Sequence, residues 1–367
     1  MVSKKREAQM ASLVFGLVHD IFLHFLLVKG QCPLAPALYV FGDSLSDSGN
    51  NNFLETIVKV NYTPYGIDFP AGATGRFNNG KTMVDFIAES LGLPLVPAYL
   101  SLSTADKNNI TTGLNYASAA AGILPESGTV IGDNLSLDEQ VEYFKVTIRT
   151  HLRRSYRNPI ERARYLSKSI FFISIGNNDY INNYLQPDNY RSSQIYTPQQ
   201  FADRLLSHLT LRITNLYLYG ARKFVVFNII RLGCLPAVVD TANPRPTTPC
   251  VEDINNLILL YNTKFPRVIT SLERTLLGST FICGDAYNVG RNSSEAGFTA
   301  AQTPCCQVST ITGQCIPEST PCQDRTQFIF WDGLHTTEVV NNVMAGDCFN
   351  GNSSCVPINI QQLVQKQ

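Results

Sequence analysis

The chain has 367 residues, 44% of them hydrophobic, and its 29 basic residues (Lys and Arg) equal its 29 acidic residues (Asp and Glu) in number. This length is enough to bury one large core, and α/β chains of this size commonly form one domain. The balanced charge gives no strong field that would attract nucleic acid or an acidic surface. We therefore expect a single domain over residues 31–367 and no nucleic-acid partner.

The first thirty residues have the pattern of a targeting segment. Basic residues at 4–6 precede apolar runs at 10–18 and 21–28, which is the order found in secretory signal peptides. Two polar residues interrupt the apolar stretch, and a spanning helix needs roughly 20 predominantly apolar residues, so a retained membrane anchor is the less favoured alternative. We predict a signal peptide over residues 1–30, cleavage before Leu38, a secreted protein and no stable membrane anchor.

The cysteines and the N-x-S/T triplets agree with a secretory route. Ten cysteines are more readily explained by disulfides in an oxidising compartment than by reduced thiols. A metal site is disfavoured because Cys305 and Cys306 are adjacent, no C-x-x-C pair exists and no histidine stands at ligand spacing. Five triplets are candidate glycosylation sites: Asn61, Asn109, Asn134, Asn292 and Asn352.

Short β-rich segments alternate with longer helical patterns along the chain. The predicted strands are residues 37–41, 114–117, 169–175, 223–229 and 279–283. The predicted helices are residues 83–91, 199–219 and 254–276, with a last helix after Thr337. This alternation predicts an α/β fold with a parallel sheet covered by helices. A Pro- and Thr-rich stretch at 243–249 is interpreted as a surface loop closed by Cys234 and Cys250.

Polar clusters directly follow the first three predicted strands. They are residues 42–44, 119–122 and 176–179. In parallel α/β sheets, ligand sites gather at the carboxyl ends of the strands. The three clusters are therefore expected to meet at one edge of the sheet.

A serine nucleophile needs a neighbouring base, usually a histidine, and a carboxylate that orients this base. The search for a hydrolytic site therefore begins with the five histidines of the chain. His19 and His24 fall in the predicted signal peptide. Arginines surround His151, so it is interpreted as part of a solvated helix face. His208 lies in a predicted amphipathic helix and is interpreted as a packed or surface residue. His335 remains as the candidate base.

Asp332 and Ser44 complete a candidate triad with His335. Asp332 precedes the histidine by three residues, so one turn can bring the carboxylate against one ring nitrogen while the other ring nitrogen faces a serine. Ser44 follows the first predicted strand, where a tight turn would expose its hydroxyl; a helix N-cap is the structural alternative. The G-x-S-x-G pattern of ordinary α/β-hydrolases does not occur.

Five sequence blocks resemble, in order, those of the plant GDSL esterase/lipase family in the SGNH hydrolase superfamily. The blocks are residues 41–52 (FGDSLSDSGNNN), 75–80 (GRFNNG), 115–118 (NYAS), 176–179 (GNND) and 331–335 (WDGLH). The resemblance implies a flavodoxin-like three-layer α/β/α sandwich with a five-stranded parallel sheet. It also implies that the serine, glycine, asparagine and histidine after which the superfamily is named correspond to Ser44, Gly122, Asn178 and His335.

The same resemblance implies an oxyanion hole. The backbone N–H groups of Ser44 and Gly122 and the side-chain amide of Asn178 would donate hydrogen bonds to a tetrahedral intermediate. The chain departs from the family at two places: Ala119 and Ala120 stand where many relatives have glycines, and Thr336 stands where proline is common. Neither departure removes a catalytic functional group.

Residues 75–82 (GRFNNGKT) also satisfy the phosphate-loop pattern G-x-x-x-x-G-K-[ST]. A phosphate loop follows a buried strand, whereas residues 61–74 contain prolines and several glycines, so nucleotide binding is disfavoured. The prediction is a secreted serine esterase or lipase that cleaves small or polymeric acyl esters without a metal or organic cofactor. An acyltransferase using the same triad and a non-catalytic glycan- or lipid-binding protein are the alternatives.

Overall fold

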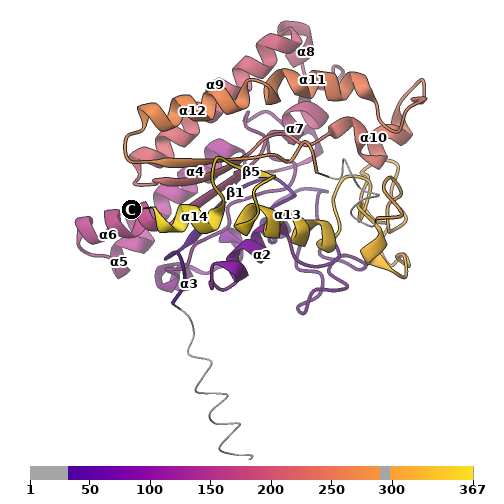
Figure 1. Ribbon diagram of the computed structural model, residues 1–367. Helices are drawn as coiled ribbons and strands as arrows, with labels where there is room; N and C mark the ends of the chain where they lie inside the picture. Colours follow the sequence, from indigo (N-terminus) through magenta and orange to yellow (C-terminus); the bar gives the residue numbers. More distant parts are fainter. Residues whose placement is uncertain (1–31, 290–297, 367) are drawn as a thin grey trace, which may run out of the picture. The chain divides into compact units, whose positions relative to one another are not determined.

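The computed structural model describes residues 32–289 and 298–366, and a compact unit extends from Ala35 to Gln367. The predicted signal peptide at 1–30 lies outside the described residues. At the centre is a sheet of five strands in the order β1-β2-β3-β4-β5 (Figure 1). The strands are β1 (Leu38–Gly42), β2 (Ile170–Ser174), β3 (Lys223–Phe227), β4 (Thr280–Gly284) and β5 (Cys355–Val356).

Four strands are parallel, and the fifth differs from the prediction. β5 pairs antiparallel with β4, and its two residues carry too little sequence signal to be predicted. The segment 114–117 is not a strand of this sheet, but it lies parallel to the outer edge of β1. The Val40 N–H donates to the Leu114 carbonyl (3.1 Å), and the Tyr116 N–H donates to the Val40 carbonyl (2.8 Å). The five predicted segments therefore have the spatial order 2-1-3-4-5, which is the flavodoxin-like order.

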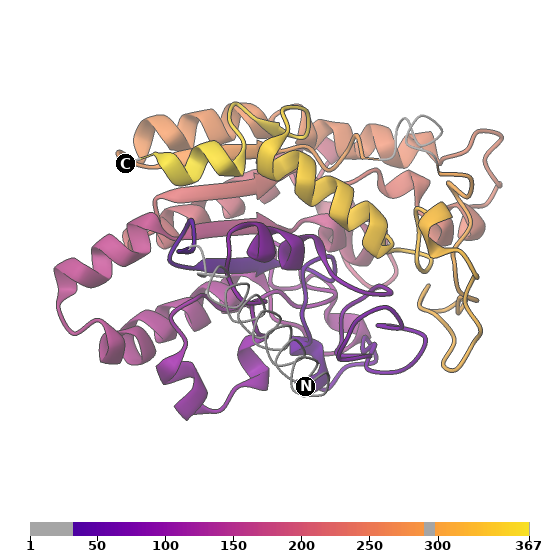
Figure 2. The same ribbon diagram turned by 60° about the horizontal axis from the view of Figure 1, so that its bottom comes forward.

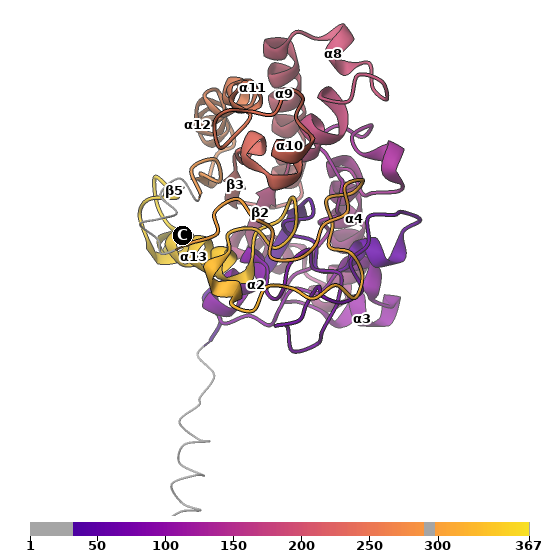
Figure 3. The ribbon, with the colours of Figure 1, turned by 90° about the vertical axis from the view of Figure 1, so that its right-hand side faces the viewer.

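Hydrophobic cores lie on both faces of the sheet because successive strand residues point to opposite faces. Tyr39 and Phe41 of β1 belong to the larger core, together with residues of α4 (Leu137–Val146), α9 (Pro198–Leu218), α11 (Glu252–Asn262) and α12 (Phe265–Thr275). Leu38 and Val40 belong to a second core with α2 (Met83–Ser90), α13 (Glu338–Asn350) and α14 (Ile360–Gln365). Figure 3 shows α9, α11 and α12 on one side of β2 and β3, with α2 and α13 on the other. The three-layer α/β/α prediction is confirmed.

The predicted helices form, with one interruption. α2 and α9 each begin with a capping box, at Thr82 and Thr197, which satisfies the free N–H groups of the first turn. Thr337 is the N-cap of α13, as expected. The predicted helix at 254–276 is divided into α11 and α12, because Pro266 lacks the N–H that a continuous helix would need there.

The remaining helices are short and lie mainly in connections. They are α3 (Thr104–Asn109), α5 (Leu152–Ser155), α6 (Pro159–Lys168), α7 (Asn177–Asp179), α8 (Ser192–Ile195) and α10 (Pro236–Thr241), with 3-10 or π turns η1 (Asn50–Phe53), η2 (Tyr99–Ser101), η3 (Thr129–Ile131), η4 (Thr147–His151), η5 (Tyr180–Tyr184), η6 (Leu232–Cys234) and η7 (Arg325–Gln327). α5 and α6 lie at the opposite end of the sheet from the gold loops that precede α13 (Figures 1 and 2). Those loops contain the candidate base.

Four disulfides join eight of the cysteines. Cys234–Cys250 closes the loop at 243–249, as predicted, and the others are Cys305–Cys322, Cys306–Cys315 and Cys348–Cys355. Cys32 and Cys283 are free, and burial raises the pKa of the Cys283 thiol to about 12. Within residues 32–289 and 298–366, no helix is long and apolar enough to cross a membrane.

Candidate active site

The turn after β1 presents Ser44 at the carboxyl edge of the sheet. The Asp43 N–H donates to the Ser174 carbonyl of β2, and the N–H groups of Ser46 and Asp47 donate to the Asp43 carbonyl. These bonds close a tight turn in which Ser44 and Leu45 are half-buried, whereas Asp43 and Ser46 on either side are buried. The serine side chain is thus held at the edge where the parallel strands end.

The structure brings Ser44, His335 and Asp332 into one hydrogen-bonded chain. Ser44 Oγ lies 2.8 Å from His335 Nε2, and His335 Nδ1 lies 2.9 Å from each Asp332 carboxylate oxygen. Asp332 is fully buried, and its Oδ1 also accepts the N–H groups of Leu334 and His335, both at 2.8 Å. Four residues of one turn therefore provide both the base and the carboxylate that orients it.

Tyr65 is a site residue that the sequence did not reveal. Its buried hydroxyl donates to Asp332 Oδ2 at 2.6 Å and accepts the Cys315 N–H at 2.9 Å. Burial, with the charge of Asp332, raises the pKa of Tyr65 well above its usual value, so the hydroxyl remains a donor. Tyr65 lies 267 residues from Asp332 in the chain, and a lone tyrosine in a loop carries no local motif.

The three candidate oxyanion donors come from separate segments. Asn178 lies in α7, and its Nδ2 donates to the carbonyl of Ala121, the residue that precedes Gly122, at 3.0 Å. Asn178 Oδ1 accepts from Asn182 Nδ2 at 2.8 Å, which orients the amide. Among the described residues, the backbone N–H groups of Ser44 and Gly122 donate no hydrogen bond.

Gly122 is fixed by Asp179, a second residue missed by sequence reasoning. The Asp179 carboxylate accepts the N–H groups of Ile123 (2.7 Å) and Leu124 (2.9 Å) and the Ser127 hydroxyl (2.7 Å). A Cβ at position 122 would lie 2.7 Å from Asp179 Oδ1 and would overlap Ser127. Glycine is therefore needed there for the backbone to approach these side chains.

Asp43 and Asp47 hold the turn around the nucleophile. Asp43 Oδ2 accepts the Asn177 amide at 2.8 Å, and Asp47 Oδ1 accepts the N–H groups of Gly49 and Asn50, both at 2.7 Å. Burial raises the pKa of each aspartate to about 6, and burial raises that of Asp179 to about 7; hydrogen bonds oppose the shift in every case. The acidic residues of the first sequence block thus bind backbone and amide groups.

The residues at which this chain departs from the family pattern lie in loops beside the site. Ala120 adopts φ 67°, in the left-handed region that favours glycine. The Ala119 N–H donates to Asn51 Oδ1 at 3.0 Å. Thr336, in place of the common proline, donates its hydroxyl to Asn341 Oδ1 at 2.7 Å. These contacts hold the two loops at the positions where the residue types depart from the family pattern.

Residues 75–82 form a loop with a structural role, and no strand directly precedes them. Arg76 Nε forms a buried ion pair with Asp85 at 2.7 Å, and Lys81 Nζ pairs with Glu89 at 2.7 Å. The Phe77 ring lies 5.0 Å from the His335 ring, measured between centroids. The lysine that a phosphate loop would use is therefore paired with α2, and the loop packs against the candidate base.

The remaining candidates lie away from this site or outside the described residues. Asn61, Asn109 and Asn352 are exposed, whereas Asn134 is half-buried and donates its amide to the Ser127 carbonyl at 3.2 Å. Asn292 lies outside the described residues. The prediction that His151 lies on a solvated helix face is wrong, because the residue is buried and its Nδ1 lies 2.8 Å from Asn108 Oδ1. Glycan attachment at the five triplets stays a prediction.

The fold defines a class of protein, the flavodoxin-like α/β hydrolases, and the site combines a serine and an asparagine that follow β1 and β2 with a glycine and a histidine from loops. The profile of the GDSL-like lipase/acylhydrolase family matches residues 38–347. The chain is 43% identical over 340 residues to GDSL esterase/lipase 7 of Arabidopsis thaliana, covering 91% of this chain and 93% of that protein. It is 44% identical over 337 residues to GDSL esterase/lipase At1g71691 of the same plant, covering 90% and 86%.

The chain therefore belongs to the GDSL-like lipase/acylhydrolase family. It is a carboxylic ester hydrolase, as the sequence predicted.

Proposed function

We propose that the protein hydrolyses carboxylic esters through an acyl-serine intermediate on Ser44. The observation that most strongly supports this proposal is the 2.8 Å distance between Ser44 Oγ and His335 Nε2. In the first step, Oγ bonds to the ester carbonyl carbon while Nε2 takes the hydroxyl proton; the proton then passes to the leaving alcohol as its C–O bond breaks. Water, deprotonated by the same nitrogen, releases the acid and restores Ser44.

Asp332 holds His335 in the state that this cycle requires. With Nδ1 protonated and directed at the carboxylate, Nε2 is left free to accept the Ser44 proton. The negative charge of Asp332 also stabilises the imidazolium that forms transiently. Tyr65 acts as a positioning residue, because its hydrogen bond fixes the second carboxylate oxygen.

The oxyanion would be bound by the N–H groups of Ser44 and Gly122 and by the Asn178 amide. Two of these donors make no other hydrogen bond in the described residues, so they are ready for the charge that develops on the carbonyl oxygen. Removing one such donor typically lowers kcat by about 10²–10³. The proposed chemistry uses no metal or organic cofactor.

We further propose that the mature protein is secreted as one domain spanning residues 31–367. The four disulfides, the basic and apolar order of the N-terminal segment and three exposed glycosylation triplets support this route. The test is expression of the full chain in a plant cell line. Its appearance in the medium without the N-terminal segment, with a mass that falls on glycosidase treatment, supports secretion; retention inside the cell contradicts it.

The serine mechanism is tested with the purified protein and its Ser44→Ala variant. Ser46→Ala, in the same turn, is the control. A fluorophosphonate should add one adduct to the wild type and to Ser46→Ala, located on Ser44 by peptide mass spectrometry, and Ser44→Ala should lose both labelling and turnover of p-nitrophenyl acetate. Equal turnover by Ser44→Ala and the wild type would contradict the acyl-serine mechanism. Ester exchange products formed with added alcohols would reveal acyl transfer.

A further inference from the structure

One end of the molecule carries a dense cluster of positive charge. Residues 145–168, which form the end of α4, η4, α5 and α6, contain eight of the 29 basic residues of the chain and one of its 29 acidic residues. The chain as a whole has no net charge, so the remainder carries a net negative charge. We call the six exposed cations of this segment the arginine-rich end: Arg149, Arg153, Arg154, Arg157, Arg164 and Lys168.

The protein does not neutralise these charges itself. None of the six side chains forms an ion pair within the part of the chain that the structure describes. The other two cations of the segment are bonded, since Lys145 pairs with Glu142 at 2.6 Å and Arg162 donates to the Tyr156 carbonyl at 2.8 Å. Six arginines elsewhere are paired with carboxylates: Arg76, Arg204, Arg212, Arg231, Arg245 and Arg325.

Three of the exposed arginines share one hollow in the surface. A cavity of about 580 Å³ is lined by Arg153, Arg154 and Arg157. Like charges that face the same hollow repel one another, and an anion placed among them would relieve this repulsion. Burial, together with the charges of Lys107 and Arg154, lowers the pKa of His151. The positive potential of this end therefore extends into the adjoining protein.

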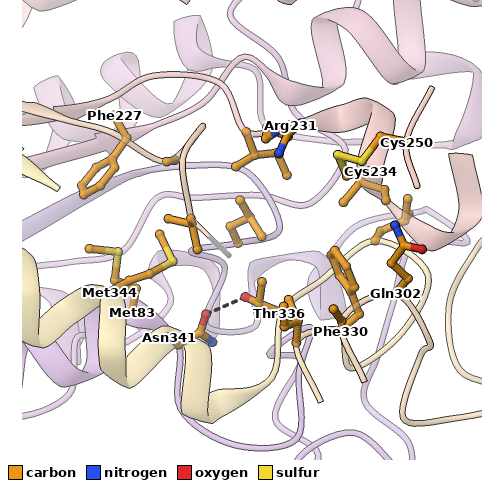
Figure 4. Close-up of a pocket in the computed structure, with 18 of the residues that line it drawn as sticks. Met83, Phe227, Arg231, Cys234, Cys250, Gln302, Phe330, Thr336, Asn341 and Met344 are labelled. Atoms are coloured by element: carbon orange, nitrogen blue, oxygen red, sulfur yellow. Dashed lines mark hydrogen bonds between the residues drawn. A yellow bond between two sulfur atoms is a disulfide. The ribbon is translucent and has the colours of Figure 1, made fainter. Parts of the chain in front are cut away.

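The arginine-rich end lies away from the catalytic edge. α5 and α6 precede β2 and lie at the opposite end of the sheet from the loops before α13 (Figures 1 and 2). The Tyr156 ring stacks on Tyr165, with centroids 4.4 Å apart, so the segment after α5 packs against α6. The pocket in Figure 4, of about 680 Å³, has Leu45 and Thr336 in its described lining and no residue of the arginine-rich end. A ligand bound at this end would leave the catalytic edge open.

The side chains of this end suit a polymer that presents oxyanions. Five of the six are arginines, whose planar guanidinium groups donate paired hydrogen bonds to carboxylate and phosphate groups. Binding of single-stranded nucleic acid also uses exposed aromatic rings, whereas Tyr156 is stacked on Tyr165. Membrane-surface segments insert Trp, Phe or Leu side chains, whereas the large apolar side chains exposed in this segment are Val146 and Ile160.

We propose that the arginine-rich end binds an acidic polysaccharide that carries carboxylate groups, and that it holds the esterase on this polymer without covering the catalytic edge. One carboxylate would lie among Arg153, Arg154 and Arg157, and the neighbouring sugars of the chain would place further carboxylates near α6. The choice of polymer rests on the proposed secretory route, because the anionic lipid leaflet that could compete for such a surface faces the cytoplasm. The binding itself does not depend on the acyl-serine mechanism.

The experiment measures the affinity of the purified protein for polygalacturonate at low and high NaCl. Every protein in the binding series carries Ser44→Ala, so that hydrolysis cannot alter the polymer. The test variant is Arg153→Gln/Arg154→Gln/Arg157→Gln. The matched control is Arg191→Gln/Arg245→Gln/Arg267→Gln, which removes the same charge from three exposed arginines outside the arginine-rich end. Thermal melting confirms that each variant is folded.

The parent protein should bind polygalacturonate and be released as NaCl rises, because salt screens exposed charges. The test variant should bind about 30-fold more weakly, since each exposed ion pair contributes about threefold to an equilibrium constant. The control should bind within about twofold of the parent. Fully methyl-esterified polygalacturonate, which lacks the carboxylates, should not bind. Polygalacturonate should leave turnover of p-nitrophenyl acetate by the wild type unchanged, because the catalytic edge stays open.

Equal affinity of the test variant and the control variant for polygalacturonate would overturn the assignment to the arginine-rich end. Tighter binding to phosphatidylserine vesicles or to DNA than to polygalacturonate would overturn the choice of polymer. Inhibition of acetate turnover by the polymer would contradict an open catalytic edge. A test variant that melts early is replaced by Arg164→Gln/Lys168→Gln, with the same outcomes.

Failure of the proposed function would have a different result. If the wild type binds polygalacturonate through the arginine-rich end but neither cleaves p-nitrophenyl acetate nor is labelled at Ser44, the binding assignment is supported and the acyl-serine mechanism is wrong. If the wild type cleaves acetate and is labelled but no protein in the series binds the polymer, the mechanism is supported and the binding assignment is wrong.

Discussion

The two halves of the active site are held together by different means. The nucleophile side, residues 42–51, 115–127 and 177–183, is fixed by hydrogen bonds to buried side chains, chiefly Asp43, Asp47 and Asp179. The acid–base side, residues 58–80 and 298–337, is fixed by two disulfides and by a cluster of aromatic residues around Trp331. One half therefore depends chiefly on buried carboxylates and the other chiefly on covalent cross-links and aromatic packing.

The difference follows from what each half presents to the substrate. The nucleophile side supplies backbone N–H groups, so the backbone itself must be fixed, and carboxylates that accept several neighbouring N–H groups do this directly. The acid–base side supplies an imidazole at the end of a long irregular segment, where few regular backbone hydrogen bonds are available. Covalent cross-links limit the freedom of such a segment.

The largest expected effect on kcat comes from removing the carboxylate of the acid–base side. Asp332→Asn should lower kcat by about 10⁴, because the amide leaves His335 in the wrong tautomer without moving the backbone. Steady-state kinetics with p-nitrophenyl acetate measure the loss, and an unchanged melting temperature separates it from unfolding. An effect below about tenfold would contradict the role assigned to Asp332.

On the nucleophile side, a substitution of Gly122 should have the most direct effect on kcat. Gly122→Ala should lower kcat by about 10²–10³, because the new Cβ meets Ser127 and Asp179 and displaces an oxyanion donor. Gly346→Ala is the control, since a Cβ there meets nothing within 4 Å. KM should change little in either variant. Equal kcat values in the two variants would remove Gly122 from the oxyanion hole.

Cross-linking is tested by removing one disulfide of the acid–base side. Cys305→Ala/Cys322→Ala opens a loop of 17 residues and should cost about 3 kcal/mol of stability. Hydrogen exchange should speed up in the described part of 298–337 and remain unchanged at 115–127. Uniformly faster exchange in both regions would show that the two halves are not fixed independently.

A smaller effect is expected at Tyr65. Tyr65→Phe removes the hydrogen bond to Asp332 Oδ2 and should lower kcat about tenfold, equivalent to about 1.4 kcal/mol. The pH profile of kcat should shift as well, because the carboxylate that supports His335 has lost a donor. Tyr62→Phe, a neighbour whose hydroxyl donates to the Cys315 carbonyl, should retain the wild-type pH profile.

The two halves should also differ in the sign of the pH dependence of their stability. Burial raises the pKa of Asp179 to about 7, so the folded state holds this proton more tightly than the unfolded chain. The free energy of unfolding should therefore fall as pH rises towards 7, by at most about 1.4 kcal/mol per pH unit for this group. Asp179→Asn should flatten that slope in urea titrations; an unchanged slope would contradict the assignment.

Asp68 on the acid–base side should behave in the opposite way. Burial raises the pKa of Asp68, but hydrogen bonds from Arg325 and Asn79 and the Arg325 charge outweigh it and hold the pKa below its usual value. Its contribution is present above the ordinary carboxyl pKa and is lost as pH falls through the lowered one. Asp68→Asn should reduce the loss of stability in acid, below about pH 4.

The sequence predicted the layers, most of the helices and the three residues Ser44, Asp332 and His335 that the structure brings into contact, because strands, helices and a four-residue turn are encoded locally. It did not predict Tyr65 or Asp179, whose roles depend on contacts between segments far apart in the chain. It also placed residues 114–117 within the sheet, whereas they hydrogen-bond along its edge and the short β5 completes it. The pocket in Figure 4 depends on side chains from many elements, so no local pattern indicates it.

The catalytic contact joins nearly the two ends of the protein. Ser44 and His335 are 291 residues apart, and the Cys305–Cys322 and Cys306–Cys315 disulfides in the segment before His335 lie after all four parallel strands. A chain emerging from the ribosome therefore has its nucleophile long before its base. The contact proposed to carry catalysis can therefore form only when most of the chain has been synthesised.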